Sequence, residues 1–275
     1  MIDLEADDPD TDAVVAALRR AGCVFAEEEA ALLRQAAASP GELSALVARR
    51  VDGIPLEYLV GWADFRGVRV ALDPGVFVPR QRTAFLIDEA LERTAARPGD
   101  RRTVVDMCCG SGALGLAATT ALRDGGVDVE LVAADIDTAA VACARRNLEP
   151  LGAQVFQGDL FAALPGELIG RVDLLLANTP YVPTAMIAQM PPEARDHEPR
   201  TALDGGADGL DVLRRVADAA GRWLTVGGWV LVEIGTAQID TATAIVAATG
   251  LRPAIAESSD YGATVVCGTR TSAGS

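Results

Sequence analysis

From about residue 80 onward, short apolar runs alternate with segments in which apolar residues recur at helical spacing. Strands that alternate with helices predict an α/β chain with a mostly parallel, doubly wound sheet. The segments before residue 80 lack this alternation, so we expect them to form smaller units. The expected strands are 103–107, 130–134, 155–157, 172–177 and 229–234, the expected helices are 113–122, 138–148, 210–224 and 236–248, and a terminal strand pair is expected around 255 and 264–267.

Residues 1–57 predict a small helical domain. Apolar residues recur at helical spacing among Ala, Leu, Glu and Arg, and Gly22 and Ser39-Pro40 separate the helices. Residues 58–79 alternate apolar with polar or Gly positions, so we expect a β-hairpin linker to the α/β domain at 80–275. The three expected helices are 13–21, 26–38 and 40–51.

Composition argues against several classes of function. Lys and Arg number 24 against 39 Asp and Glu, so the net charge is −15, which disfavours the phosphate neutralisation that loose nucleic-acid binding needs. No apolar stretch approaches the roughly 20 residues of a membrane span, and the acidic segment 1–12 does not resemble a signal peptide. We therefore expect a cytoplasmic protein, with a disordered tail at 271–275.

Cysteine and histidine usage gives no sign of a metal site. The five cysteines are scattered and lack C-x-x-C spacing, which is typical of a reduced cytosolic protein without structural zinc. We expect Cys108-Cys109 to be small residues in a strand-to-loop bend rather than a chelating pair. His197 is the only histidine, so neither a usual metal site nor a histidine base is expected.

A glycine-rich loop follows the first expected strand of the α/β domain. Gly110, Gly112 and Gly115 fit G-x-G-x-x-G at the start of a helix, where the backbone can approach a ligand closely. Asp135 lies 20 residues after Gly115, where a dinucleotide enzyme places the carboxylate that binds ribose. The motif alone therefore leaves a nicotinamide or flavin oxidoreductase open.

The acidic residues around this loop favour S-adenosylmethionine as the cofactor. Asp106 stands before the glycines, where a carboxylate would repel a pyrophosphate but attract the ammonium group of S-adenosylmethionine. Asp135 suits the ribose hydroxyls, Asp159 can accept a hydrogen bond from an adenine amino group, and Leu160 can pack on the ring. Each Asp could instead only cap the next helix. The expected cofactor-binding residues are Asp106, Cys108, Cys109, Gly110, Ser111, Gly112, Asp135, Ile136, Asp159, Leu160 and Asn178.

A second motif, Asn178-Thr179-Pro180-Tyr181, follows the expected strand at 172–177. The Asn178 side chain and the Thr179 carbonyl can both accept hydrogen bonds from one planar NH2 group, and Tyr181 can cover the face of that group. An ordinary turn asparagine and a core tyrosine are the structural alternatives. We expect these four residues to be both the catalytic and the substrate-binding residues.

Taken in this order, the motifs resemble those of class I S-adenosylmethionine-dependent methyltransferases. More narrowly, the chain is similar to the protein-(glutamine-N5) methyltransferases that modify peptide chain release factors, whose Asn-Pro-Pro-Tyr motif it matches at three of four places. Segments 54–61, 78–80 and 198–210 are more specific to that branch. The resemblance covers nearly the whole chain. It implies a Rossmann-like fold, S-adenosylmethionine as methyl donor, a protein glutamine as acceptor, and an N-terminal domain that helps to hold the protein substrate.

Three departures from that pattern bear on the substrate more than on the chemistry. Thr179 replaces the first proline, Cys108 replaces a usual glycine, and Gln81, Arg82 and Ala84 interrupt a Pro-Arg-Pro-Glu-Thr-Glu stretch. An adenine-N6 nucleic-acid methyltransferase shares the Asn-Pro-Pro-Tyr motif, although the negative charge argues against it. A dinucleotide oxidoreductase and a non-catalytic adaptor that keeps the fold also stay open.

Overall fold

The computed structural model describes residues 11–95 and 101–272. Most of the acidic segment 1–12, and the end of the tail 271–275, lie outside these residues, so their expected properties stay predictions. No helix within the two described ranges is long and apolar enough to cross a membrane.

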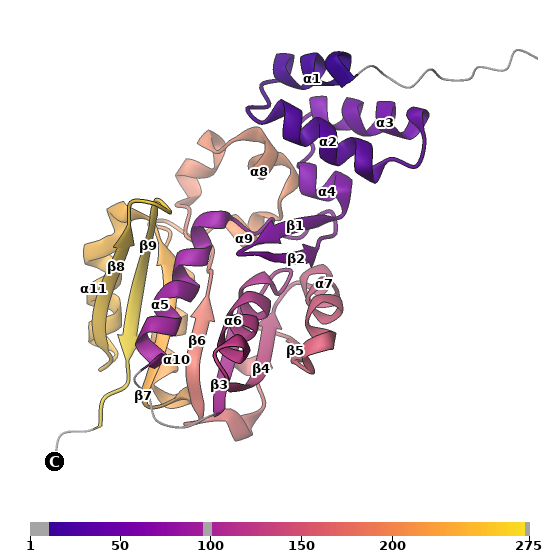
Figure 1. Cartoon of the computed structure of the whole chain (residues 1–275). Coiled ribbons are helices and arrows are strands. Elements are labelled where there is room, and N and C mark those ends of the chain that lie inside the picture. Colours follow the sequence, from indigo (N-terminus) through magenta and orange to yellow (C-terminus); the bar gives the residue numbers. More distant parts are fainter. Residues whose placement is uncertain (1–10, 96–100, 273–275) are drawn as a thin grey trace, which may run out of the picture.

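A seven-stranded sheet forms the centre of the molecule, in the order β5-β4-β3-β6-β7-β9-β8 (Figure 1). Neighbouring strands from β5 to β7 run parallel, whereas β9 pairs antiparallel with both β7 and β8. The expected doubly wound α/β sheet with a terminal strand pair is therefore confirmed. The strands are β3 (Arg101–Met107), β4 (Asp128–Asp135), β5 (Gln154–Gln157), β6 (Val172–Ala177), β7 (Leu224–Ile234), β8 (Arg252–Ser258) and β9 (Ala263–Thr269).

Helices cover both faces of the sheet because its central strands are apolar on both sides. Val104 and Leu174 pack in one buried cluster with α5, α6 and α7, whereas Val105 and Leu175 pack in another with α10 and α11. Successive side chains of a strand point to opposite faces, so a continuous apolar run suits a sheet that is covered twice. Each such side chain contributes roughly 1.5–3 kcal/mol when fully buried. The helices are α5 (Ala84–Ala95), α6 (Ala113–Asp124), α7 (Thr138–Leu148), α10 (Asp211–Trp223) and α11 (Ile239–Ala248).

The N-terminal helices form a second, smaller core. Leu18, Leu33 and Leu43 come from three successive helices and are at most 2% exposed. The third helix begins after Ser39, whose side chain accepts a hydrogen bond from the Glu42 N–H. Figure 1 shows these helices grouped at one end of the molecule. Their bounds are α1 (Thr11–Arg20), α2 (Ala26–Ala36) and α3 (Pro40–Val51).

The connector between the two cores differs from expectation. Residues 58–60 belong to a short helix, α4 (Leu56–Val60), so the hairpin does not begin at Tyr58 but at Trp62, with strands β1 (Trp62–Phe65) and β2 (Val68–Ala71). Gly61 ends α4 in the left-handed conformation, with φ 81°. Burial of the Tyr58 side chain on the helix outweighs the strand preference of this apolar run. Besides α4, the α-helices α5, α8 (Pro192–His197) and α9 (Arg200–Leu203) of the described residues have no counterpart among the expected elements.

Asn147 on α7 ties the hairpin to the glycine-rich loop. Its Oδ1 accepts a hydrogen bond from the Ala71 N–H at 2.9 Å, and its Nδ2 donates at 2.8 Å to the carbonyls of Ala71 and Ser111. A single amide therefore satisfies backbone groups of two segments that are far apart in sequence. This contact holds the hairpin against the α/β domain beside the candidate site.

Arg50 on α3 joins the helical unit to the α/β domain. It is 7% exposed, and its Nε and Nη2 donate to the Glu29 carboxylate of α2 at 2.6 and 3.2 Å. Its Nη1 donates to Glu193 of α8, in the segment that follows Asn178-Tyr181. One guanidinium thus links two N-terminal helices to the region of the candidate site.

Arg50→Ala is expected to lower the free energy of unfolding by about 3–5 kcal/mol, because it leaves the buried Glu29 carboxylate without its partner. Chemical denaturation measures this loss. Arg49→Ala is the control, since Arg49 is exposed on the same helix, and its effect should stay within about 0.5 kcal/mol. Equal effects of the two substitutions would contradict a structural role for the ion pair.

Candidate active site

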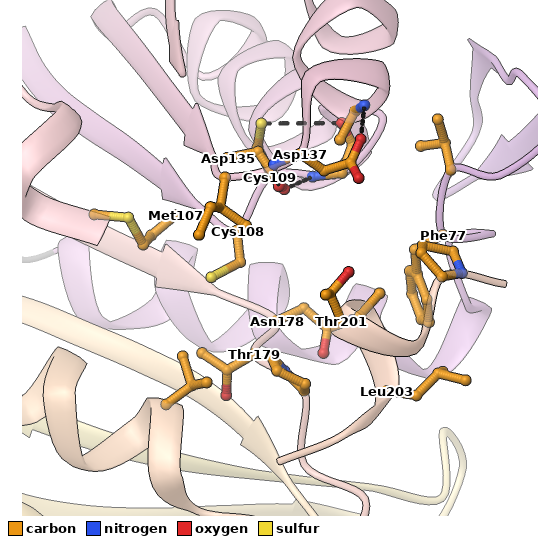
Figure 2. A pocket seen from close by; sticks show the side chains of 18 of the residues that line it. Phe77, Met107, Cys108, Cys109, Asp135, Asp137, Asn178, Thr179, Thr201 and Leu203 are labelled. Carbon is orange, nitrogen blue, oxygen red and sulfur yellow. Dashed lines mark hydrogen bonds between the residues drawn. The ribbon is translucent and has the colours of Figure 1, made fainter. Parts of the chain in front are cut away.

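A cavity of about 590 Å³ opens at the carboxyl ends of β3, β4 and β6. Its size lies within the roughly 300–1,000 Å³ of small-molecule sites. In the sheet register Met107 pairs with Ala134 on one side and with Ala177 on the other. Cys108 and Asn178, which follow the ends of β3 and β6, therefore lie at one level with Asp135, the last residue of β4, and all three line the cavity (Figure 2).

The structure brings the expected site residues together with one exception. Gly112 does not line the cavity, because it turns the loop into α6 with φ 80°. His197 ends α8 and is not among the residues that line the cavity in the described part of the chain. The expected residues on the cavity wall are Asp106, Cys108, Cys109, Gly110, Ser111, Asp135, Ile136, Asp159, Leu160, Asn178, Thr179, Pro180 and Tyr181.

Cys108 has a left-handed backbone with φ 57°, a conformation that costs a non-glycine residue roughly 1–2 kcal/mol. This explains why glycine is usual here in the family that the chain resembles. The loop is held in place by a hydrogen bond from the Cys109 N–H to the Ala134 carbonyl at 3.1 Å. Burial raises the pKa of the Cys108 thiol, with the Asp135 carboxylate as the next cause, so this side chain stays neutral.

Asp135 fixes the loop from the neighbouring strand. Its Oδ2 accepts a hydrogen bond from the Gly110 N–H at 2.8 Å, and its Oδ1 accepts one from the Asp137 N–H at 2.9 Å. Burial raises its pKa. Each oxygen keeps a free lone pair for a ligand hydroxyl. The side chain of Ile136 beside it is 61% exposed, which leaves an apolar surface at the cavity wall.

Asp106 is a buried carboxylate with one unsatisfied oxygen. Its Oδ2 accepts a hydrogen bond from the Gly115 N–H at 2.8 Å, whereas its Oδ1 has no partner among the described residues. Burial raises its pKa to about 8, the Gly115 N–H opposes this shift, and the Asp135 charge adds to it. An orphaned carboxylate oxygen beside a cavity suits a cationic ligand group.

Asp159 differs from the other two acidic residues. Its Oδ2 accepts a hydrogen bond from Arg215 Nη2 of α10 at 2.7 Å, and its side chain is half exposed. Leu160 follows with a left-handed φ of 48° and lines the cavity. Since a carboxylate has two oxygens, the ion pair leaves Oδ1 available to a ligand amino group.

Asn178 has a half-buried side chain that makes no hydrogen bond to the described residues, and it lies on the cavity wall. Thr179 and Pro180 next to it are buried. A free carboxamide at a strand end is thus available to a ligand, which is what the second motif predicts. The adjacent Tyr181 also lines the cavity.

The segment 203–209 packs against the backbone of the residues that follow Asn178. The Val182 N–H donates to the Leu203 carbonyl and the Gly205 N–H donates to the Val182 carbonyl. A Cβ on Gly205 would lie 2.5 Å from the Pro180 carbonyl oxygen, and one on Gly209 would lie 2.2 Å from the Tyr181 carbonyl oxygen. Glycine is therefore required for this close approach.

Several residues around the cavity carry no role in the sequence analysis. Glu233 is the one charged residue of β7 and stands next to its last residue, and that lone charge in an apolar strand is a signal for a buried contact. Arg80, whose guanidinium donates to the buried Glu198 carboxylate, lies on the cavity wall with its partner. No local pattern identifies either partner, because each contact joins residues far apart in sequence. The added residues are Asn147, Arg82, Glu198, Glu233 and Gln238.

Residues 67–190 match the family described as methyltransferase small domain. A release factor glutamine methyltransferase from Geobacter sulfurreducens is 39% identical over 217 residues, which cover 77% of this chain and 72% of that protein. A ribosomal protein uL3 glutamine methyltransferase from Burkholderia pseudomallei is 36% identical over 209 residues, which cover 72% of this chain and 66% of that protein. The chain belongs to the glutamine methyltransferase family.

Family membership decides the class of cofactor and reaction. S-adenosylmethionine is the methyl donor, so an S-adenosylmethionine-dependent glutamine methyltransferase is favoured over a dinucleotide oxidoreductase, an adenine methyltransferase and an adaptor. The expected class I fold is confirmed by a solved methyltransferase structure from Pyrococcus furiosus. That structure is 13% identical, covers 74% of this chain and 90% of its own, and superimposes with a TM-score of 0.54.

The Asp106 carboxyl predicts a pH dependence of stability. The native group binds its proton up to about pH 8, whereas an unfolded Asp loses it near pH 4, so the free energy of unfolding of the ligand-free enzyme should fall as pH rises between these values. Asp106→Asn should remove this part of the slope in thermal or urea unfolding. The exposed control Asp124→Asn should keep the slope. An unchanged slope in Asp106→Asn would contradict the shift.

Gly209→Ala should destabilise more than a glycine substitution with the same backbone conformation elsewhere. Gly126 has φ 82° and nothing within 4 Å of an added Cβ, so Gly126→Ala should cost only the left-handed penalty of about 1–2 kcal/mol. Gly209, with φ 80°, adds a clash with the Tyr181 carbonyl and should cost about 1–3 kcal/mol more. Urea unfolding compares the two variants, and equal losses would show that the 203–209 contact is not tight.

Proposed function

We propose that this enzyme transfers the methyl group of S-adenosylmethionine to the side-chain amide nitrogen of a glutamine in a protein, with peptide chain release factors as the substrate. The observation that carries the proposal is the free Asn178 carboxamide, one residue beyond the strand that pairs with β3, at the level of the cofactor loop. Relatives named for release factors and for ribosomal protein uL3 both lie in the family. A ribosomal protein is therefore the second candidate substrate.

Two hydrogen-bond acceptors on neighbouring residues, one on a side chain and one on the backbone, hold the substrate nitrogen. Asn178 Oδ1 and the Thr179 carbonyl accept the two N–H groups of the glutamine amide, and Tyr181 packs against its plane. The amide nitrogen is a weak nucleophile because its lone pair is delocalised, as the roughly 18–20 kcal/mol rotation barrier of a peptide bond indicates. Acceptors aimed at the nitrogen stabilise the positive charge that develops there during attack. No general base is needed before that step: the S–CH3 bond would break to leave a neutral thioether, and the methylated nitrogen would then release one N–H proton to solvent.

The chain's acidic residues fit S-adenosylmethionine, which supplies a methyl group on a sulfonium. The unsatisfied Oδ1 of Asp106 would pair with the ammonium group once that cation favours the ionised carboxylate, and Asp135 would accept hydrogen bonds from the ribose hydroxyls. Asp159 would accept from the adenine amino group through the oxygen that Arg215 leaves free. Ile136 and Leu160 offer apolar surface to the ring.

The N-terminal unit, residues 1–57, is proposed to hold the protein substrate, with 58–79 as the linker and 80–275 as the methyltransferase domain. Val24 and Phe25, in the turn before α2, have side chains that are 83% and 65% exposed. Such exposed apolar side chains suit contact with a protein. Five free cysteines support the cytoplasmic location that the sequence predicts.

Asn178→Ala tests the proposal. Incubation of the enzyme with a release factor and S-adenosylmethionine should give methylglutamine in mass spectrometry, and Asn178→Ala should reduce the rate by about 10²–10³-fold, the loss seen when one aligned polar group is removed. Cofactor affinity, measured by calorimetry, should stay within a few-fold. Normal turnover of Asn178→Ala at saturating cofactor would contradict the role assigned to Asn178. Methylation of ribosomal protein uL3 but not of a release factor would favour the second substrate.

A further inference from the structure

We propose that Glu233 is a positioning residue, which acts with Arg82 to lock the Tyr181 ring as a fixed wall for the acceptor amide. Glu233 lies on β7 behind the cavity, whereas Arg82 and Tyr181 lie on its wall. The inference rests on the proposed function, since it assigns the ring a substrate to face.

Three side chains form a closed network. The Tyr181 hydroxyl donates to Glu233 Oε1 at 3.0 Å, and Arg82 Nε lies 3.1 Å from the same oxygen. Arg82 Nη2 also donates to the Tyr181 hydroxyl, and its guanidinium lies 5.7 Å from the ring centroid. A hydroxyl that donates to one neighbour and accepts from another has its position fixed on both sides, so the ring plane is fixed with it.

The burial of the Glu233 carboxylate is costly for stability, and only one of its oxygens is bonded to Tyr181 and Arg82. Its side chain is 3% exposed, its Oε2 has no partner among the described residues, and its neighbours Leu231 and Val265 are buried and apolar. Removing a carboxylate from water is costly, and an apolar residue of similar volume is often as stable or more so at such a place. We therefore assign the role of Glu233 to the two groups that bond its Oε1, the Tyr181 hydroxyl and the Arg82 guanidinium.

The network also keeps the phenol protonated. Burial and the Glu233 charge raise the pKa of Tyr181, while the Arg82 charge opposes this shift. The phenol therefore donates to Glu233 throughout the physiological range. A carboxylate at position 82 would face Glu233 with like charge, whereas the Arg82 guanidinium lies 3.1 Å from Glu233 Oε1 and is attracted to it.

Kinetics of Tyr181→Phe, Glu233→Leu and the double variant test the proposal. Each single change should lower kcat/KM for a glutamine-containing substrate about ten- to a hundred-fold, because a hydrogen bond to a charged group is lost. The affinity for S-adenosylmethionine should stay within about two-fold. The double variant should equal the single variants, since both remove one interaction. Glu233→Gln, which keeps an acceptor, should restore most activity, and the exposed Glu257→Gln should change nothing.

A second readout does not depend on turnover. The chain has three tyrosines, so 3-fluorotyrosine labelling gives three ¹⁹F NMR signals, of which Tyr181→Phe identifies one. In Glu233→Leu that signal should move and the other two should not. If wild-type enzyme forms no methylglutamine, the proposed function is overturned. The ¹⁹F shift would still test whether Glu233 contacts the Tyr181 hydroxyl. An unmoved signal, additive kinetic losses, or a loss of folded enzyme with unchanged kcat/KM would overturn the positioning role.

Discussion

The hydrogen-bonded pairing of β3 with β6 is the contact on which the site depends. It aligns Met107 with Ala177, and so sets the cofactor loop beside Asn178, although about 70 residues separate them in the chain. At this place the strand order changes direction, because β4 follows β3 on one side and β6 lies on the other. Helices that leave to opposite faces keep a crevice open between the strand ends. The cofactor loop and Asn178 therefore meet at this crevice.

The site is built from locally unfavourable features that the two cores offset. Cys108 has a left-handed backbone, and Asp106 and Glu233 each bury a carboxylate with one unpaired oxygen. Such features cost one to several kcal/mol each. The sheet beneath them buries large aliphatic side chains on both faces, each of which contributes roughly 1.5–3 kcal/mol. The buried strands continue up to Met107 and Ala177, so the apolar core reaches the edge of the site.

The sequence predicts the sheet and the two motifs because both are encoded locally. Apolar runs mark β3 to β7, and the polar residues that end those runs mark the cavity. Contacts between distant residues are not encoded in this way. Glu233 meets Tyr181 across 52 positions and Arg82 meets it across 99, so neither partner can be deduced from spacing. The hairpin start fails for a different reason, since Gly61 and burial of Tyr58 make a helix from residues that favour strands. Helix α5 is missed because it precedes the first expected strand, where the alternating pattern begins.

Thr179 raises the question of how the acceptor motif stays rigid without its first proline. The ring of proline would fix φ at that position, and threonine does not. In this chain the surrounding packing supplies the constraint. Thr179 is 3% exposed, Gly205 and Gly209 lie against the carbonyls of Pro180 and Tyr181, and Gln238 Nε2 donates to the Tyr181 carbonyl at 2.9 Å. The backbone on the far side of the residue is the end of β6, held in the sheet. A loop that is fixed at both ends and closely packed along its length does not need a second ring to aim the Thr179 carbonyl, so the substitution is compatible with the same chemistry.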